Sequence, residues 1–116
     1  MPPPSKVAIA TGSVLRLVKE EASYHKEIAQ QEERIRKLDA SEGDENKAYT
    51  LKQEKQALAE TRNVLPSMQT RIGAALEKLE EALAANKEGG AEASAEDITK
   101  AKDAVAKGKE ALGQVS

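Results

Sequence analysis

His25 is the only histidine of the 116-residue chain, and it follows Glu21 by four residues. On a helix this spacing places both side chains on one face, where they could offer two ligands to a metal ion. Zinc sites need three or four protein ligands, and di-iron bundles need Glu-x-x-His on two helices together with further glutamates. Ala22 stands where the glutamate of that motif would be. We therefore expect no metal site.

The sequence also lacks the residues on which covalent catalysis and phosphate binding usually depend. The sequence has no cysteine, which excludes a thiolate nucleophile and a disulfide. A serine or threonine nucleophile needs a base, and His25 has no evident acid–base partner and no oxyanion loop beside it. The pair Gly89-Gly90 lacks the Gly-Lys-Ser/Thr ending of a phosphate loop. We predict that the protein is not an enzyme and uses no cofactor.

The charge and the aromatic content of the chain restrict the kinds of partner that it can bind. Acidic and basic residues are interleaved and sum to -2, and the chain has no phenylalanine or tryptophan. Such a surface neither gathers nucleic acid by charge nor offers aromatic rings on which bases stack. No segment reaches the roughly 18 apolar residues of a membrane span, and Met1-Pro2-Pro3-Pro4 lacks the parts of a signal peptide. We expect a soluble, cytoplasmic protein that binds neither nucleic acid nor membranes.

A seven-residue repeat predicts a first helix from about residue 13 to 40. Its a and d positions hold Val14, Leu17, Ile28, Ile35 and Leu38, with Glu21, Tyr24 and Gln31 in the remaining slots. Polar groups in such a seam cost stability but can fix the register in which helices pair. On the outer face, Glu32 with Arg36 and Glu33 with Lys37 have the favourable i,i+4 order. Gly43 and Asp44 then favour a short turn, which makes the next helix antiparallel.

The second helix is expected from about residue 45 to 85. Its seam is formed by Leu51, Leu58, Leu65, Ile72 and Leu79, with Thr61, Met68, Ala75 and Ala82 between them. Pro66 lies inside this repeat, where it removes a hydrogen bond to the carbonyl of Arg62 at a cost of about 3 kcal/mol. Since the apolar register continues past it, we predict one helix with a kink near residues 62–66.

The third helix is expected over residues 95–113, after a flexible loop over 86–95. Ser94 and Asp97 resemble a capping box at its start. Its apolar repeat consists of Ile98, Val105 and Leu112 with Ala101 between. Gly108 and Gly113 should each weaken it by up to about 1 kcal/mol.

These elements predict an all-α fold, an antiparallel three-helix bundle of the spectrin-like, coiled-coil rod type with its second helix kinked at Pro66. Only side-by-side packing can bury the apolar stripes of such long helices. Residues 1–12 would be an N-terminal tail leading into the first helix. Residues 13–113 would form a single domain.

Two stretches of sequence resemble the tubulin-binding cofactor A family of tubulin-specific chaperones. The first stretch comprises Thr11-Gly12-Ser13-Val14, Arg16-Leu17-Val18-Lys19-Glu20, Tyr24, Lys26-Glu27, Gln31-Glu32 and Ile35. The second comprises Leu58, Glu60, Arg62, Leu65-Pro66, Arg71 and Ile72. Both occur in order, and the resemblance covers about Val7 to Leu79. The polyproline start and the third helix depart from the family pattern, which puts the contacts of that helix in doubt.

The resemblance implies a three-helix bundle that captures β-tubulin folding intermediates after their release from the cytosolic chaperonin. It would hold them for the later cofactors that assemble the αβ heterodimer, and so be cytoskeleton-associated. Family members use polar helix faces, so the resemblance implies β-tubulin-binding roles for Arg16, Lys19, Glu20, Lys26, Glu27, Glu32, Glu60, Arg62 and Arg71. The other tubulin-folding cofactors would be indirect partners, and the protein would be a monomer or a homodimer. The alternative from the residues alone is a generic coiled-coil module that scaffolds or oligomerises.

Overall fold

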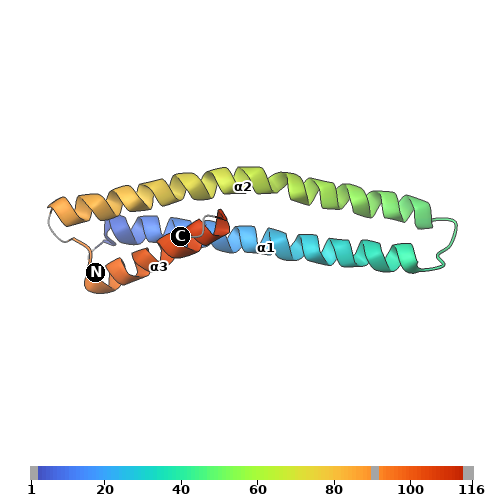
Figure 1. Ribbon diagram of the computed structural model, residues 1–116, viewed down its shortest axis with the longest axis horizontal. Helices are drawn as coiled ribbons and strands as arrows, with labels where there is room; N and C mark the ends of the chain where they lie inside the picture. Colours follow the sequence, from blue (N-terminus) through green and yellow to red (C-terminus); the bar gives the residue numbers. More distant parts are fainter. Residues whose placement is uncertain (1–2, 90–91, 114–116) are drawn as a thin grey trace. The chain divides into compact units, whose positions relative to one another are not determined.

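The computed structural model describes residues 3–89 and 92–113, which form three helices and no strand (Figure 1). The helices are α1 (Lys6–Ala40), α2 (Lys47–Gly89) and α3 (Ala95–Ala111). The expected all-α fold of three antiparallel helices is confirmed. The chain forms two compact units, one of Met1–Glu20 with Met68–Ser116 and one of Glu21–Ser67. The single domain over residues 13–113 stays a prediction.

The three-helix unit contains the start of α1, the second half of α2 and all of α3. Its largest fully buried side chains are Val7, Val14, Met68, Ile72 and Leu79. From α3 only small residues are buried, namely Ala101, Ala104 and Gly108. The predicted seam residues Ile98, Val105 and Leu112 are only half-buried. The heptad pattern thus selected the wrong stripe of α3, apart from Ala101, because small side chains let this helix pack closely.

Helix α1 begins at Lys6, so the expected tail over residues 1–12 is wrong from residue 6 onward; residues 1 and 2 lie outside the described part. Ser5 explains the earlier start. Its hydroxyl accepts a hydrogen bond from the backbone N–H of Ala8 at 3.1 Å, as an N-cap does. The same hydroxyl donates to a carboxylate oxygen of Asp97 at 3.2 Å. Ser5 therefore caps α1 and ties it to the first turn of α3.

The two-helix unit is a hairpin made from the end of α1 and the start of α2. Its most buried residues are Glu21, Ile28, Gln31, Leu58 and Thr61. The polar seam positions expected at residues 21 and 31 are therefore interior, whereas Ile35, Leu38, Leu51 and Leu65 are half-buried. Buried polar side chains between the helices are thus concentrated in this unit.

The turn between α1 and α2 forms largely as predicted. Gly43 has a φ of 46°, in the left-handed region. The Asp44 carboxylate accepts the N–H of Asn46 at 2.8 Å. Lys47 adds a contact that the sequence did not indicate, since its ammonium donates to the carbonyls of Asp39 at 3.0 Å and Ser41 at 2.5 Å. A cation at the end of α1 satisfies carbonyls that have no partner within the helix.

The other helix ends differ from expectation by a few residues. Helix α2 continues to Gly89, so the expected loop over residues 86–95 is too long; residues 90 and 91 lie outside the described part. Asn86 stays helical, and its side-chain oxygen accepts the N–H of Ala93 at 3.1 Å. Ser94 caps α3 as predicted, accepting from the N–H of Asp97 at 3.0 Å. Helix α3 ends at Ala111 rather than 113, because Gly113 has a φ of 74°.

Pro66 lies inside α2 without ending it, as the continuous apolar register predicts. Its ring is exposed. The kink near residues 62–66 stays a prediction.

Candidate partner-binding surface

The histidine pair does not extend into a metal site. His25 Nε2 lies 3.5 Å from a carboxylate oxygen of Glu21. The side chain of Glu21 is 4% exposed and that of His25 is 57% exposed, so the imidazole lies over a buried carboxylate. Within residues 3–89 and 92–113, no three His, Asp or Glu side chains gather where they could hold a metal ion. The pair is thus a contact of the helix with itself.

The length and hydropathy of the helices decide whether any of them could span a membrane. Over the described part of the chain, none of the helices is both long enough and apolar enough to cross a bilayer.

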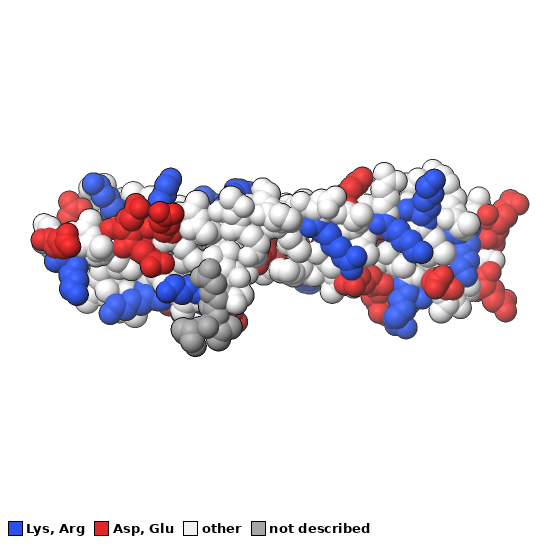
Figure 2. Space-filling model, turned by 45° about the horizontal axis from the view of Figure 1, so that its top comes forward, with Lys and Arg blue, Asp and Glu red and all other residues white. Residues whose placement is uncertain are grey.

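All nine residues expected to bind a partner lie on the outside of the helices. Eight of them are exposed and Glu20 is half-buried. The three-helix unit carries Arg16, Lys19, Glu20 and Arg71, and the hairpin unit carries Lys26, Glu27, Glu32, Glu60 and Arg62. Figure 2 shows basic and acidic side chains lying next to one another rather than separated by sign. The nine residues thus form two sets, one on each unit.

In the hairpin unit, the structure brings Arg62 and Glu32 together. Their side chains are 3.1 Å apart and link α2 to α1, although 30 residues separate them in the sequence. Each side chain is about half exposed, at 53% and 52%. Arg34 and Glu54 form a second pair between the same helices at 3.7 Å. The sequence did not indicate this second pair, because only the register of the hairpin places the two residues opposite each other.

The predicted pair of Glu32 with Arg36 is wrong. Arg36 instead bonds Glu33 through two nitrogens, at 2.5 and 3.0 Å. The hydrogen bond from Arg36 holds the pKa of the Glu33 carboxyl below its usual value. Lys37 also approaches Glu33, at 3.8 Å, as the i,i+4 spacing predicts. Glu32 is thereby left to bond Arg62 on the neighbouring helix.

In the three-helix unit, Arg71 lies near Glu20. An Arg71 nitrogen is 3.9 Å from a Glu20 carboxylate oxygen and 3.6 Å from the sulfur of Met68. This geometry places a guanidinium group at the edge of the interface between α1 and α2. Arg16 and Lys19 extend from the same stretch of α1 and are exposed.

Comparison with known proteins shows the family of this helical chain. The family model described as tubulin binding cofactor A matches residues 2–105. The chain belongs to the tubulin binding cofactor A family. It is 40% identical to mouse tubulin-specific chaperone A over 83 residues, which cover 72% of this chain and 74% of the relative. It is 43% identical to the human protein of that name over 70 residues, or 60% of this chain and 62% of the relative.

A solved structure of another tubulin binding cofactor A family member has the same fold. The crystal structure of tubulin folding cofactor A from Arabidopsis thaliana superposes with a TM-score of 0.77 at 31% identity. The match covers 90% of this chain and 92% of the plant protein. The family resemblance of the sequence is thereby confirmed, and the residues that the family model matches, 2–105, extend into the third helix.

Proposed function

We propose that this protein is a tubulin-folding cofactor that binds and stabilises β-tubulin folding intermediates released from the cytosolic chaperonin. It would hold them on the route to αβ heterodimer assembly, in the cytoplasm and in association with the cytoskeleton. Membership of the tubulin binding cofactor A family is the observation that carries this proposal. The cofactor would act by binding alone, without a catalytic step.

The exposed charged residues are the proposed contact surface, because the largest buried apolar side chains of the three-helix unit are used internally. Met68, Ile72 and Leu79 are at most 1% exposed, so they cannot reach a partner without unfolding. By contrast, Arg62 and Glu32 keep about half of their surface in water. A partner could contact both ends of this pair while the fold stays intact.

Reversible binding follows from the strength of these pairs. Exposed ion pairs contribute at most about 1 kcal/mol to stability, so exchanging an internal partner for a client's charge costs little. Contacts of this kind are also screened by salt, with a Debye length of about 8 Å at physiological ionic strength. We therefore expect client binding to weaken as salt is raised, which would allow the client to be handed on.

The experiment is a release assay. Radiolabelled β-tubulin bound to the cytosolic chaperonin is discharged with ATP, with or without this protein, and the products are separated on a native gel. We expect a discrete band that contains β-tubulin and this protein, and no equivalent band when α-tubulin replaces β-tubulin. Equal capture of both tubulins would contradict β-tubulin specificity, and capture of neither would contradict the proposal as a whole.

The generic coiled-coil module makes a different prediction. It requires the isolated protein to be an obligate multimer, whereas the cofactor can act as a monomer or a homodimer. Sedimentation equilibrium across a hundredfold range of protein concentration measures this state. A stable higher oligomer with no tubulin binding would favour the scaffold.

A further inference from the structure

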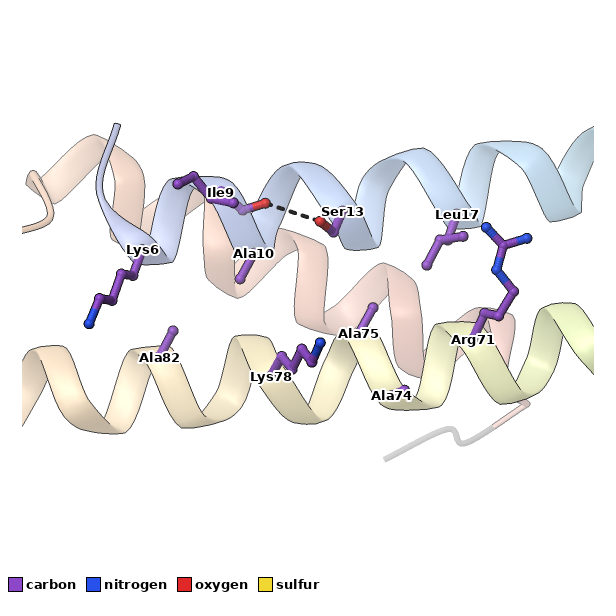
Figure 3. A pocket seen from close by; sticks show the side chains of 10 residues that line it. All are labelled: Lys6, Ile9, Ala10, Ser13, Leu17, Arg71, Ala74, Ala75, Lys78 and Ala82. Carbon is purple, nitrogen blue, oxygen red and sulfur yellow. Dashed lines mark hydrogen bonds between the residues drawn. The ribbon is translucent and has the colours of Figure 1, made fainter. Parts of the chain in front are cut away.

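A groove of about 570 Å³ runs between α1 and α2 in the three-helix unit. It is lined by Lys6, Ile9, Ala10, Ser13, Leu17, Arg71, Ala74, Ala75, Lys78 and Ala82. In Figure 3, Ala10 projects from α1 toward α2, and Ala75 and Ala82 project from α2 toward α1. No lining residue comes from α3, which passes behind the groove (Figure 3). The groove is therefore a solvent-facing part of the interface between α1 and α2 that α3 does not line.

Helical spacing sets the length of this groove. On α1 the stripe runs from Lys6 to Leu17, and on α2 it runs from Arg71 to Ala82. Each stripe spans eleven residue steps, or about 16 Å at 1.5 Å per residue. An occupant that fills the groove would thus be about three helical turns long.

The walls of the groove favour a helix over an extended strand. The side chains between the helices are mostly alanine, and the hydroxyl of Ser13 donates back to the carbonyl of Ile9 at 3.3 Å. The backbone groups of α1 and α2 are likewise bonded within their own helices. The groove offers no strand edge with which an extended segment could pair its backbone N–H and C=O groups, whereas a helix satisfies its own. Small side chains also allow the close approach that helix packing needs.

The charge around the groove selects the occupant further. Lys6, Arg71 and Lys78 line it and no acidic residue does. Arg71 lies 3.9 Å from Glu20, but neither Lys6 nor Lys78 forms an ion pair within the described part of the chain. On the other side of α2, toward α3, a second groove is lined by Glu77, Glu80 and Glu81 instead. The α1–α2 groove is thus the basic one of the two.

An exposed apolar side chain lies at the edge of the same groove. Ile9 is 59% exposed, although large aliphatic side chains are usually buried. A partner that covers Ile9 would remove this surface from water. Small apolar side chains along the groove, Ile9 at its edge and basic charges beside them form a surface that can receive an amphipathic helix.

From these features we propose that the groove between α1 and α2 binds an acidic amphipathic helix of the protein client, about three turns long. This inference rests on the proposed function, since it names the part of the tubulin client that the chaperone would hold. Acidic side chains spaced about two turns apart on the client would meet Arg71 and Lys78, which are seven residues apart on α2. Apolar side chains between them would contact Ala74 and Ala75, and an apolar side chain beyond Lys78, toward Lys6, would cover Ile9 (Figure 3).

Charge reversal tests the proposal. Lys78→Glu places an acidic residue in the groove, and Lys102→Glu makes the same change on α3, outside the groove. Both lysines are exposed, so both variants should fold. Circular dichroism and thermal melting would check this. We expect Lys78→Glu to weaken β-tubulin capture about tenfold or more, because like charges across an interface repel, and Lys102→Glu to change it less than twofold.

The outcomes separate this inference from the proposed function. If the wild-type protein captures no β-tubulin, the proposed function is wrong and the inference falls with it. If the wild type captures β-tubulin and Lys78→Glu captures it equally well, only the groove is wrong.

A crosslinking measurement identifies the occupant. Because the chain has no cysteine, a thiol-reactive photo-crosslinker can be attached at one introduced cysteine alone. Ala74→Cys carries it in the groove, and Ala106→Cys carries it on an exposed position of α3. We expect the groove position to crosslink one client segment, and mass spectrometry to show that it is acidic and helix-forming. A basic segment, an extended segment, or equal crosslinking from the α3 position would overturn the proposal.

Discussion

Gly108 of α3 lies so close to Leu76 of α2 that a Cβ atom at Gly108 would be 2.7 Å from a methyl carbon of Leu76. The γ carbon of Leu76 would be 2.8 Å away. Leu76 is 4% exposed and has little room in which to move. The absence of a side chain at position 108 is therefore what allows α3 to approach α2 this closely.

Gly108→Ala should destabilise the protein by about 1 kcal/mol. Alanine favours a helix by about 1 kcal/mol over glycine, but overpacking against a buried leucine costs about 1 to 3 kcal/mol. Gly12→Ala is the matched control, since nothing lies within 4 Å of its Cβ position, and it should stabilise by up to about 1 kcal/mol. Urea unfolding measures both. Stabilisation of equal size at the two positions would show that α3 does not depend on this approach.

Gln31→Met should stabilise the hairpin unit by about 1 kcal/mol or more. Gln31 is 4% exposed, and its side-chain oxygen has no hydrogen-bond partner among residues 3–89 and 92–113. Leaving a buried acceptor unpaired costs about 1 to 3 kcal/mol, and methionine has a similar length without that acceptor. Gln30→Met, on the exposed side of the same helix, is the control and should be nearly neutral. A loss of stability in Gln31→Met would mean that the amide fixes the helix register.

Pro66→Ala should stabilise α2 by up to about 3 kcal/mol. The substitution supplies an N–H that can donate to the carbonyl of Arg62, and it removes a ring of the kind that clashes with this carbonyl in a regular helix. Ser67→Ala, at the exposed neighbouring position, should gain no more than about 0.5 kcal/mol. If Pro66 kinks the helix, the small-angle scattering profile of the Pro66→Ala variant will also differ. An unchanged profile would show that Pro66 does not kink the helix.

Much of the fold could be predicted from the sequence because the seven-residue repeat of α2 is unbroken. Leu58, Ile72 and Leu79 were placed in the seam and are buried. The same reasoning failed on α3, where Ala104 and Gly108 replace the larger residues as the buried stripe. Heptad reasoning assigns burial to large aliphatic residues, whereas closely packed helices bury small ones.

The start of α1 shows another limit. The first apolar repeat was assigned from residue 13, yet Val7 and Thr11 continue the buried stripe toward the N-terminus at i,i+4 spacing. Ser5, a preferred N-cap residue just before this stripe, was the signal that could have located the helix end. Its link to Asp97, 92 residues away, could not be predicted because it depends on tertiary structure.

The candidate binding residues were located correctly on the surface, but their pairing was not. Helical spacing favoured Glu32 with Arg36, and the structure pairs Glu32 with Arg62 across the hairpin. Local spacing reports only neighbours on one helix. The basic groove was missed for the same reason, since Lys6 and Lys78 approach it from different helices.

Charge reversal of Glu20 and Glu27 to Lys should weaken β-tubulin capture while changing stability by no more than about 1 kcal/mol. Glu27 is exposed and the Glu20–Arg71 pair is partly exposed, so both contribute little to folding. Helicity and melting temperature should stay close to the wild-type values. Unchanged capture by this variant would show that the charged face of α1 is not part of the contact surface.

Co-migration with β-tubulin tests the central claim most directly. The purified protein is mixed with β-tubulin released from the heterodimer and separated by size-exclusion chromatography at low and physiological salt. We predict a complex that elutes ahead of either component, contains both proteins, and is reduced at higher salt. Separate elution of the two proteins under all conditions would contradict the account.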